Sequence, residues 1–206
     1  MMGHAGMAAT VVRYLRSVGA PTAEVPPLDV LPRPDLRAVG DDERAPVDPA
    51  EFRRVLGEFA SGVTVVTAAD PDTGAAGFAC QSFASLSLDP PLVAFMVART
   101  STTWPRIARA GSFCVNVLAA DQGELCRGFA VSGADKFAGV AYDEAPVSGA
   151  PRLDGVAAWI DCAIHAVHTG GDHLIVVGRV TALGADGNGA GPLLFHQGRF
   201  AGLPRD

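Results

Sequence analysis

The sequence predicts a mainly β domain whose strands form a mostly antiparallel barrel, closed or nearly closed. About six or seven β-rich segments adjoin one another along the chain instead of alternating with helices, which favours antiparallel pairing. Only a few helical segments interrupt them, as is typical of barrels. Hydrophobic residues make up 49% of the 206 residues and charged residues 18%, enough for one domain with a substantial core.

Residues 1–47 differ in composition from the rest of the chain. Only "TVVRYLRSV" (10–18) suits a short helix there. Prolines interrupt any longer element: Pro21, Pro26, Pro27, Pro32, Pro34 and Pro46. We interpret residues 1–47 as a Pro-rich N-terminal extension and residues 48–206 as the folded domain.

The domain is predicted to begin with a helix in "DPAEFRRVLGEFASG" (48–62). Asp48 suits the N-cap, Pro49 suits the first helical position, and Glu51 completes a capping box. Gly62 supplies the stop. Apolar residues recur at helical spacing and predict one apolar stripe: Phe52, Val55, Leu56 and Phe59.

The later elements follow from β-branched and aromatic runs bounded by turn residues. Helices are expected at 102–111, with Pro105 in the first turn, and at 121–130, opening on Asp121. Residues 131–155 read as irregular. Strands are expected at 63–69, 77–88, 91–98, 112–118, 156–169, 173–183 and 192–200.

The stretch "GFACQSFASLSLDPPLVAF" (77–95) alternates small or polar residues with apolar ones. A regular strand would place these two sets on opposite faces: Gly77, Ala79, Gln81, Ser85 and Ser87 against Phe78, Cys80, Ala84, Leu86 and Leu88. Small residues let a flat ligand lie against the backbone, and hydroxyls can bind phosphate. Arg99 and the hydroxyl-rich "TSTTW" (100–104) follow. The pattern suits a phosphorylated planar cofactor, and a solvent-exposed strand is the alternative.

Several classes of function are disfavoured by composition. The net charge of −6 argues against a nucleic-acid partner, which requires a basic face. No run approaches the roughly 18 to 20 apolar residues needed to span a bilayer. The first nine residues lack the Lys or Arg of a signal peptide, so we expect a cytoplasmic protein.

Metal and nucleophile sites are not predicted either. The cysteines at 80, 114, 126 and 162 form no Cys-x-x-Cys pair and read as small buried hydrophobes. His165 and His168 would point to opposite faces of a strand. The glycine-rich "GNGAG" (187–191) precedes a strand, so it reads as a loop instead of a phosphate cradle. No Gly-x-Ser-x-Gly elbow is present.

Five segments resemble flavin reductases of two-component monooxygenase systems, in the order found in that family. They are "FASGVTVVTA", "SFASLSLDPPLVAF", "SFCVNVLAADQ", "GDHLIVVGRV" and "PLLFHQGRFAGL", and the resemblance covers residues 51–203. It implies an FMN-binding-like split β-barrel with Greek-key topology and a homodimer. It also implies reduction of FAD or FMN by NADH or NADPH, with NADH favoured. The reduced flavin would then serve a separate monooxygenase.

The resemblance also implies site residues. The flavin would lie along residues 78–83, with its chain or phosphate at 85–87 and 99–104 nearby: Phe78, Ala79, Cys80, Gln81, Ser82, Phe83, Ser85, Leu86, Ser87, Arg99, Ser101, Thr102, Thr103 and Trp104. No side chain would act as acid, base or nucleophile, since hydride passes directly between the two rings. Many relatives have Thr at the position of Ala79, and Asn or Ser at that of Gln81. These differences leave the choice between FAD and FMN open.

Four more residues match positions near the nicotinamide or the flavin. The resemblance implies that His173 lines the nicotinamide pocket with Phe200 close by, and that Lys136 and Phe137 lie near the site. By their residues alone, His173 also suits a hairpin histidine bonded to its own turn, Phe200 and Phe137 suit packing, and Lys136 suits a solvated surface.

Two other functions fit a flavin-binding barrel. A pyridoxamine-phosphate-oxidase-like FMN enzyme would favour several Arg and Lys around the phosphate, where little beyond Arg99 is evident. A flavin-binding electron-transfer protein would not turn over. Continuous oxidation of reduced nicotinamide with free flavin separates the enzyme from that carrier.

Overall fold

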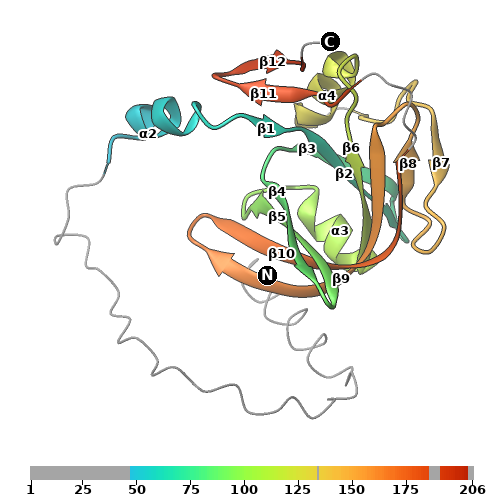
Figure 1. Cartoon of the computed structure of the whole chain (residues 1–206). Coiled ribbons are helices and arrows are strands. Elements are labelled where there is room, and N and C mark those ends of the chain that lie inside the picture. The colour runs from blue at the N-terminus through green and yellow to red at the C-terminus, as the bar shows by residue number, and fades with distance from the viewer. Residues whose placement is uncertain (1–46, 134, 186–190, 204–206) are drawn as a thin grey trace, which may run out of the picture. The chain divides into compact units, whose positions relative to one another are not determined.

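The computed structural model describes residues 47–133, 135–185 and 191–203 (Figure 1). The chain divides into one compact unit that ends at Gly57 and a second from Glu58 to Asp206. The short helix predicted at 10–18 and all but the last residue of the predicted loop at 187–191 lie outside the described residues. None of the described helices is long and apolar enough to cross a membrane.

Helix α2 (Pro49–Leu56) begins where the sequence predicts it. Asp48 Oδ1 accepts the backbone N–H groups of Ala50 (2.8 Å) and Glu51 (3.0 Å), which confirms the N-cap. The predicted capping box is incomplete, because the Glu51 carboxylate instead accepts two hydrogen bonds from Arg54.

The end and the face of α2 differ from the prediction. The helix stops at Leu56 with Gly57 at the C-cap, so Phe59 lies outside it. The predicted stripe residues within the helix, Phe52, Val55 and Leu56, are exposed in this chain. Helical spacing therefore identified the helix, but it did not identify a buried face.

The second unit contains the described strands and two further helices. Its strands are β1 (Ser61–Gly62), β2 (Thr64–Asp70), β3 (Gly74–Cys80), β4 (Phe83–Leu88), β5 (Pro91–Ala98), β6 (Ser112–Val117), β7 (Tyr142–Glu144), β8 (Pro151–Leu153), β9 (Ala158–Gly170), β10 (His173–Gly184), β11 (Leu194–His196) and β12 (Arg199–Ala201). Its helices are α3 (Trp104–Ala110) and α4 (Gly123–Ala130).

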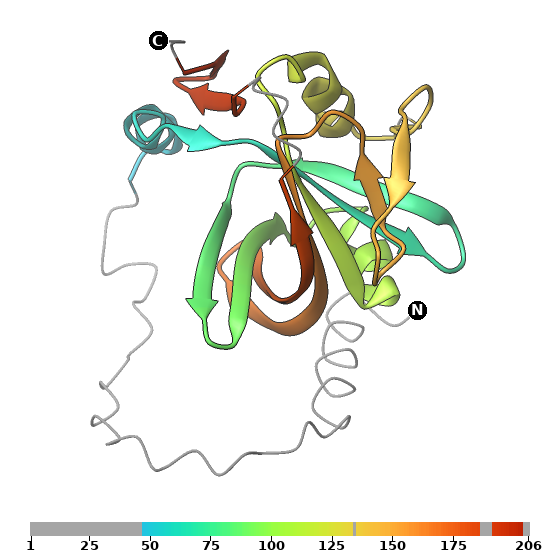
Figure 2. The same ribbon diagram turned by 45° about the vertical axis from the view of Figure 1, so that its right-hand side comes forward.

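Seven strands form one antiparallel sheet in the order β3-β2-β6-β9-β10-β5-β4, which curls into a barrel (Figure 2). β3 and β4 follow each other along the chain but lie at opposite edges of the sheet, so residues 81–82 connect the two edges. At this corner the carbonyl of Ser82 accepts the backbone N–H of Met96 on β5 (3.1 Å). The mainly β, antiparallel split-barrel prediction is confirmed.

The prediction of one regular strand over 77–88 is wrong. The chain leaves β3 at Cys80 and enters β4 at Phe83, and β4 pairs with β5 instead of β2. A register shift between Ser85 and Ser87 interrupts β4 again. Since side chains alternate faces only within a regular strand, the two predicted faces do not extend across this stretch.

Three smaller predictions also differ from the structure. The segment 131–155, predicted as irregular, contains the hairpin of β7 and β8. The strand predicted at 192–200 is the hairpin of β11 and β12, with Gln197 at φ +48° in its turn. Helix α4 begins at Gly123, and the residue before it is Gln122 instead of the predicted Asp121.

Aromatic rings fill the interior of the barrel. Phe95 of β5 contacts Phe78 (ring centroids 6.0 Å apart), Trp104 (6.4 Å) and Phe113 (5.1 Å). A second cluster packs on the other face of the sheet beneath α4 and β8, and Phe129 and Leu153 belong to it. The sheet is therefore buried on both faces where β2 and β6 run, in agreement with their near-continuous burial.

Gly178 in β10 is required by the packing of the barrel interior, which gives a first prediction. A Cβ at this position would lie 2.3 Å from Cζ of Phe113. We expect Gly178→Ala to lower the free energy of unfolding by about 1 to 3 kcal/mol, because a packed core resists overfilling. Urea unfolding measures it.

Gly128 is the matched control, since a Cβ there meets nothing within 4 Å and the residue lies inside α4. Gly128→Ala is expected to raise the free energy of unfolding by about 0.5 to 1 kcal/mol, because Ala suits a helix interior better than Gly. Equal free energies of unfolding for Gly178→Ala and Gly128→Ala would contradict this prediction, because they would show that Phe113 moves aside without cost.

Candidate functional site

A pocket of about 460 Å³ lies beside the first half of β3. Its walls come from β3 and the turn before it, the start of α3, and the loop after α4. The lining residues are Thr73, Ala75, Ala76, Gly77, Thr102, Thr103, Arg106, Gly133, Asp135, Lys136 and Phe137. Because β3 is an edge strand of its sheet, backbone groups along its outer side are open to side chains and to ligands.

Lys136 contributes an ammonium to this pocket. Its Nζ donates to the carbonyl oxygens of Gly77 (3.2 Å) and Phe129 (3.0 Å), and partial burial lowers its pKa. Both acceptors are uncharged, and no carboxylate pairs with it among the described contacts. Phe137 packs against Phe129 and Tyr142 and so holds the loop in place. This arrangement favours an anionic ligand.

Arg106 contributes the second cation, which was not predicted from the sequence. Its Nε donates to Thr73 Oγ1 (2.8 Å), and its Nη2 donates to the carbonyls of Thr73 (3.0 Å) and Ala75 (2.9 Å). The predicted residues Thr102 and Thr103 precede it and line the same pocket. The available signal was a basic residue in the first turn of a helix that follows hydroxyl-bearing residues.

Asp70 lies behind Arg106 and is buried. Its carboxylate accepts two hydrogen bonds from Arg109 (3.1 and 2.9 Å) and one from the hydroxyl of Thr73 (2.7 Å). The guanidinium of Arg109, followed by the Thr73 hydroxyl, holds the pKa of this carboxyl well below its usual range. Asp70 is therefore ionised and fully paired at any physiological pH.

Two predicted residues of the 99–104 segment have structural partners. Ser101 Oγ accepts the backbone N–H of Trp104 (3.2 Å) at the start of α3. The Trp104 ring is buried against Phe95 in the barrel interior and does not line the pocket. Its predicted contact with a flavin stays a prediction.

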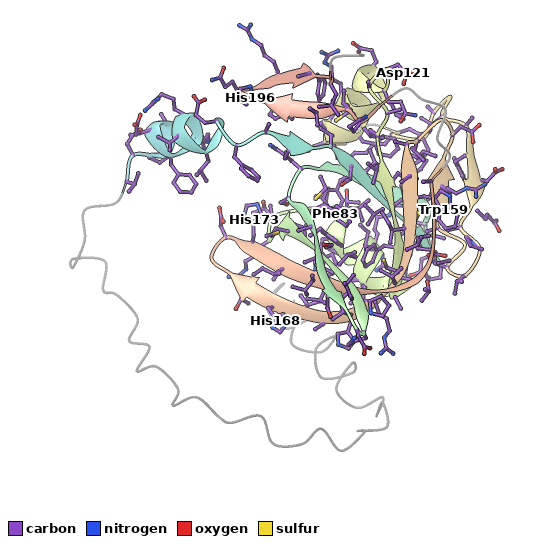
Figure 3. The ribbon with its side chains drawn as sticks, viewed as in Figure 1. Phe83, Asp121, Trp159, His168, His173 and His196 are labelled. Atoms are coloured by element: carbon purple, nitrogen blue, oxygen red, sulfur yellow. The ribbon has the colours of Figure 1, made fainter. Side chains whose placement is uncertain are left out.

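The predicted ring-binding stretch, 78–83, spans the end of β3 and the corner. The Ser82 hydroxyl donates to the carbonyl of Met96 (3.1 Å), so it helps to hold the corner against β5. Cys80 is buried, and burial raises its pKa. Gln81 is exposed, and Phe83, the first residue of β4, is half-buried (Figure 3).

The small residues of β3 serve packing as well as access. A Cβ on Gly77 would lie 2.8 Å from the ring of Phe129 in α4, and Ala79 packs against the cluster beneath that helix. Of the predicted small face, Gly77 and Ala79 therefore point toward α4. Gly77 contributes its backbone to the pocket, because its carbonyl oxygen accepts a hydrogen bond from Lys136 Nζ.

The serines of β4 lie away from this pocket, on the other edge strand of the sheet. Ser85 and Leu86 are exposed and Ser87 is partly buried, with the register shift between them. Their predicted contact with a flavin stays a prediction.

His173 begins β10 at the β9–β10 hairpin and pairs with Ala98 at the end of β5 (Figure 3). His173 Nδ1 lies 2.7 Å from Asp172 Oδ1, and this contact lowers the pKa of the Asp172 carboxyl. The backbone N–H of Arg99 donates to the carbonyl of Asp172 (2.9 Å), which ties the hairpin turn to the end of β5. Within the chain His173 thus has the hairpin contact, and its role toward nicotinamide stays a prediction.

Phe200 does not lie beside His173 within one chain. It packs against α4, with Phe195 at 5.7 Å and the guanidinium of Arg127 at 5.1 Å from its ring centroid. Figure 1 shows β12 beside α4 and away from the β9–β10 hairpin. Within one chain the two residues therefore lie apart, and the predicted role of Phe200 near the nicotinamide stays a prediction.

The cysteines and histidines do not form a metal site in the described ranges. No group of three or more His, Cys, Asp or Glu residues is placed to hold an ion there. All four cysteines are free and buried, as predicted, and burial raises the pKa of Cys114 and Cys162 to about 12. Such thiols are unreactive.

Comparison with known proteins assigns the family. The model of the flavin reductase like domain matches residues 56–204. The chain is 48% identical over 160 residues to a flavin reductase of Pseudomonas putida, covering 78% of this chain and 93% of that protein. It is 49% identical over 160 residues to HsaB, the reductase subunit of a flavin-dependent monooxygenase of Rhodococcus jostii, covering 78% and 80%.

A solved structure agrees with this assignment. The NADH:FAD oxidoreductase SgcE6 of Streptomyces globisporus C-1027, in complex with NAD and FAD fragments, superposes with a TM-score of 0.72 at 37% identity. The match covers 79% of this chain and 99% of that one. The chain belongs to the flavin reductase-like family.

Proposed function

We propose that this chain is an NAD(P)H:flavin oxidoreductase that reduces FAD or FMN and supplies the reduced flavin to a separate monooxygenase. The observation that carries the proposal is the pocket beside β3, where Lys136, Arg106 and two threonines meet an open strand edge. Relatives that are reductase subunits of flavin-dependent monooxygenases support the separate oxygenase partner.

The pocket fits the phosphate of a flavin nucleotide. Two cations line it, and one of them, Lys136, has only carbonyl partners within the described contacts. The threonine hydroxyls at 102 and 103 add donors that suit phosphate oxygens. Asp135 also lines the pocket and partly offsets its positive charge. Lys136 and Arg106 would hold the phosphate, and the 78–83 stretch would hold the ring.

When bound, the flavin supplies a ring system that accepts a hydride from the reduced nicotinamide. The chain's own residues bind and orient the two partners, because correct placement of the rings is what the reaction needs from a protein. No side chain is proposed as acid, base or nucleophile. The carboxylate behind the pocket, Asp70, is buried and paired with arginine.

We further infer that NADH is preferred over NADPH and that the protein is cytoplasmic. SgcE6 is named an NADH:FAD oxidoreductase, which supports a preference for NADH. The four free cysteines are compatible with a reducing compartment. Cell fractionation checks the location.

Steady-state oxidation of NADH and NADPH, with FAD, FMN and riboflavin supplied separately, tests the function. We expect many turnovers per chain with free flavin and faster turnover with NADH than with NADPH. Stoichiometric reduction that then stops would indicate a non-turnover flavin carrier instead. No oxidation of either nicotinamide with any flavin would contradict the proposed function.

His173 is proposed to line the nicotinamide site. His173→Ala is expected to lower kcat/KM for NADH about 10-fold, equivalent to about 1.4 kcal/mol, with flavin affinity unchanged. The matched control is His168→Ala, which replaces an exposed histidine of β9 and should leave the kinetics unchanged. A His173→Ala protein with a lower melting temperature but an unchanged kcat/KM for NADH would contradict this role and show that His173 only stabilises the hairpin.

We also propose a homodimer. β4 is an edge strand that exposes apolar side chains, with Leu88 95% and Leu86 55% exposed. Uncovered apolar edge strands promote association, and a second copy would cover this one. Light scattering is expected to give about twice the chain mass of 21.2 kDa, and a monomer at micromolar concentration would argue against the proposal.

A further inference from the structure

Arg106 is held to the protein along one side only. Nε and Nη2 donate to Thr73 and to the start of β3, whereas Nη1 has no acceptor among the described residues. The guanidinium lines the pocket, so its unpaired amine is available to a ligand there. The N–H groups of Nη1 can donate charge-assisted hydrogen bonds to a phosphate oxygen, while Nε and Nη2 hold the guanidinium in place.

Asp70 fixes the position of this guanidinium from behind. Its Oδ2 lies 3.4 Å from Arg106 Nε, and it accepts the hydroxyl hydrogen of Thr73, whose oxygen in turn accepts from Arg106. The Asp70 side chain is fully buried, whereas that of Arg106 is 32% exposed. Asp70 does not line the pocket, so it acts on a ligand only through its neighbours.

Arg109 keeps Asp70 from neutralising Arg106 completely. Two arginines of α3 share the one buried carboxylate, and Arg109 makes the closer pair with it, at 2.9 Å. The exposed Asp72 lies 3.4 Å from Arg109, where water screens the pair. Arg106 therefore retains positive charge toward the pocket.

We propose that Arg106 binds the phosphate of the flavin nucleotide and that Asp70 is a positioning residue that holds Arg106 in place for it. The proposal rests on the proposed function and names the residues that make the site select phosphorylated flavins. It places the phosphate beside β3, and not on the serines of β4.

Binding of FMN and of riboflavin, which differ only by the phosphate, tests the proposal by fluorescence titration. Arg106→Gln is expected to weaken FMN binding about 10-fold and to leave riboflavin binding within about 2-fold, because riboflavin has no phosphate for Arg106 to contact. Asp70→Asn should shift the same ratio in the same direction by a smaller factor. The matched control is Arg179→Gln, an exposed arginine of β10, which should leave both affinities unchanged.

Arg106→Lys covers the case in which Arg106→Gln does not fold. Lys keeps the charge but cannot bridge Thr73 and a ligand at once. A several-fold loss of the preference for FMN in the folded Lys variant supports the proposal, and an unchanged preference overturns it. For Asp70→Asn, equal weakening of FMN and riboflavin would assign Asp70 to stability alone and overturn its positioning role.

A Ser85→Ala, Ser87→Ala double variant separates the two possible phosphate sites. Selective loss of FMN binding in this variant, with normal binding in Arg106→Gln, would place the phosphate on β4 and overturn the proposal while the flavin reductase function stands. A wild-type chain that binds neither flavin and oxidises no nicotinamide would instead remove the proposed function itself.

Discussion

The buried carboxylate of Asp70 connects the segments on which the pocket depends: the end of β2, the turn that leads to β3, and α3. A buried charge is stable only when donors surround it, and here they come from Thr73, Arg106 and Arg109. Helix α3 has seven residues, too few to be stable alone. Its position follows from these ion pairs together with the burial of Ile107.

Arg106 and Lys136 donate hydrogen bonds to the open edge of β3 and the turn before it. Carbonyl oxygens at residues 73 to 75 accept from Arg106, and the carbonyl of Gly77 accepts from Lys136. Side chains that occupy an edge in this way hinder its pairing with another strand. The edge strand thus forms one wall of the pocket, and two cationic side chains are hydrogen-bonded to it. Such a wall suits a reaction in which the protein mainly orients two flat ligands.

Much of the architecture was predictable because its signals are local. "GGD" between two long β-rich runs predicted the β9–β10 hairpin, and Asp48 with Pro49 predicted the start of α2. The family motifs identified Lys136, Thr102 and Thr103, which the structure brings to one pocket. Arg106 was not predicted, because its partners at residues 73 to 75 lie about thirty residues earlier in the chain. Nothing local in a helix indicates which sheet edge it will face.

By itself, the sequence determined the antiparallel β class, the positions of most strands along the chain and, through five motifs, the resemblance to flavin reductases. Only the tertiary structure decided that residues 77–88 are two strands at opposite edges of one sheet, separated by the corner at 81–82. It also decided that Trp104 belongs to the core and that Phe200 packs on α4. The physical reason is that alternation reports a face only while a strand stays regular. Which edge or helix a side chain meets depends on chain reversals that bring distant residues together.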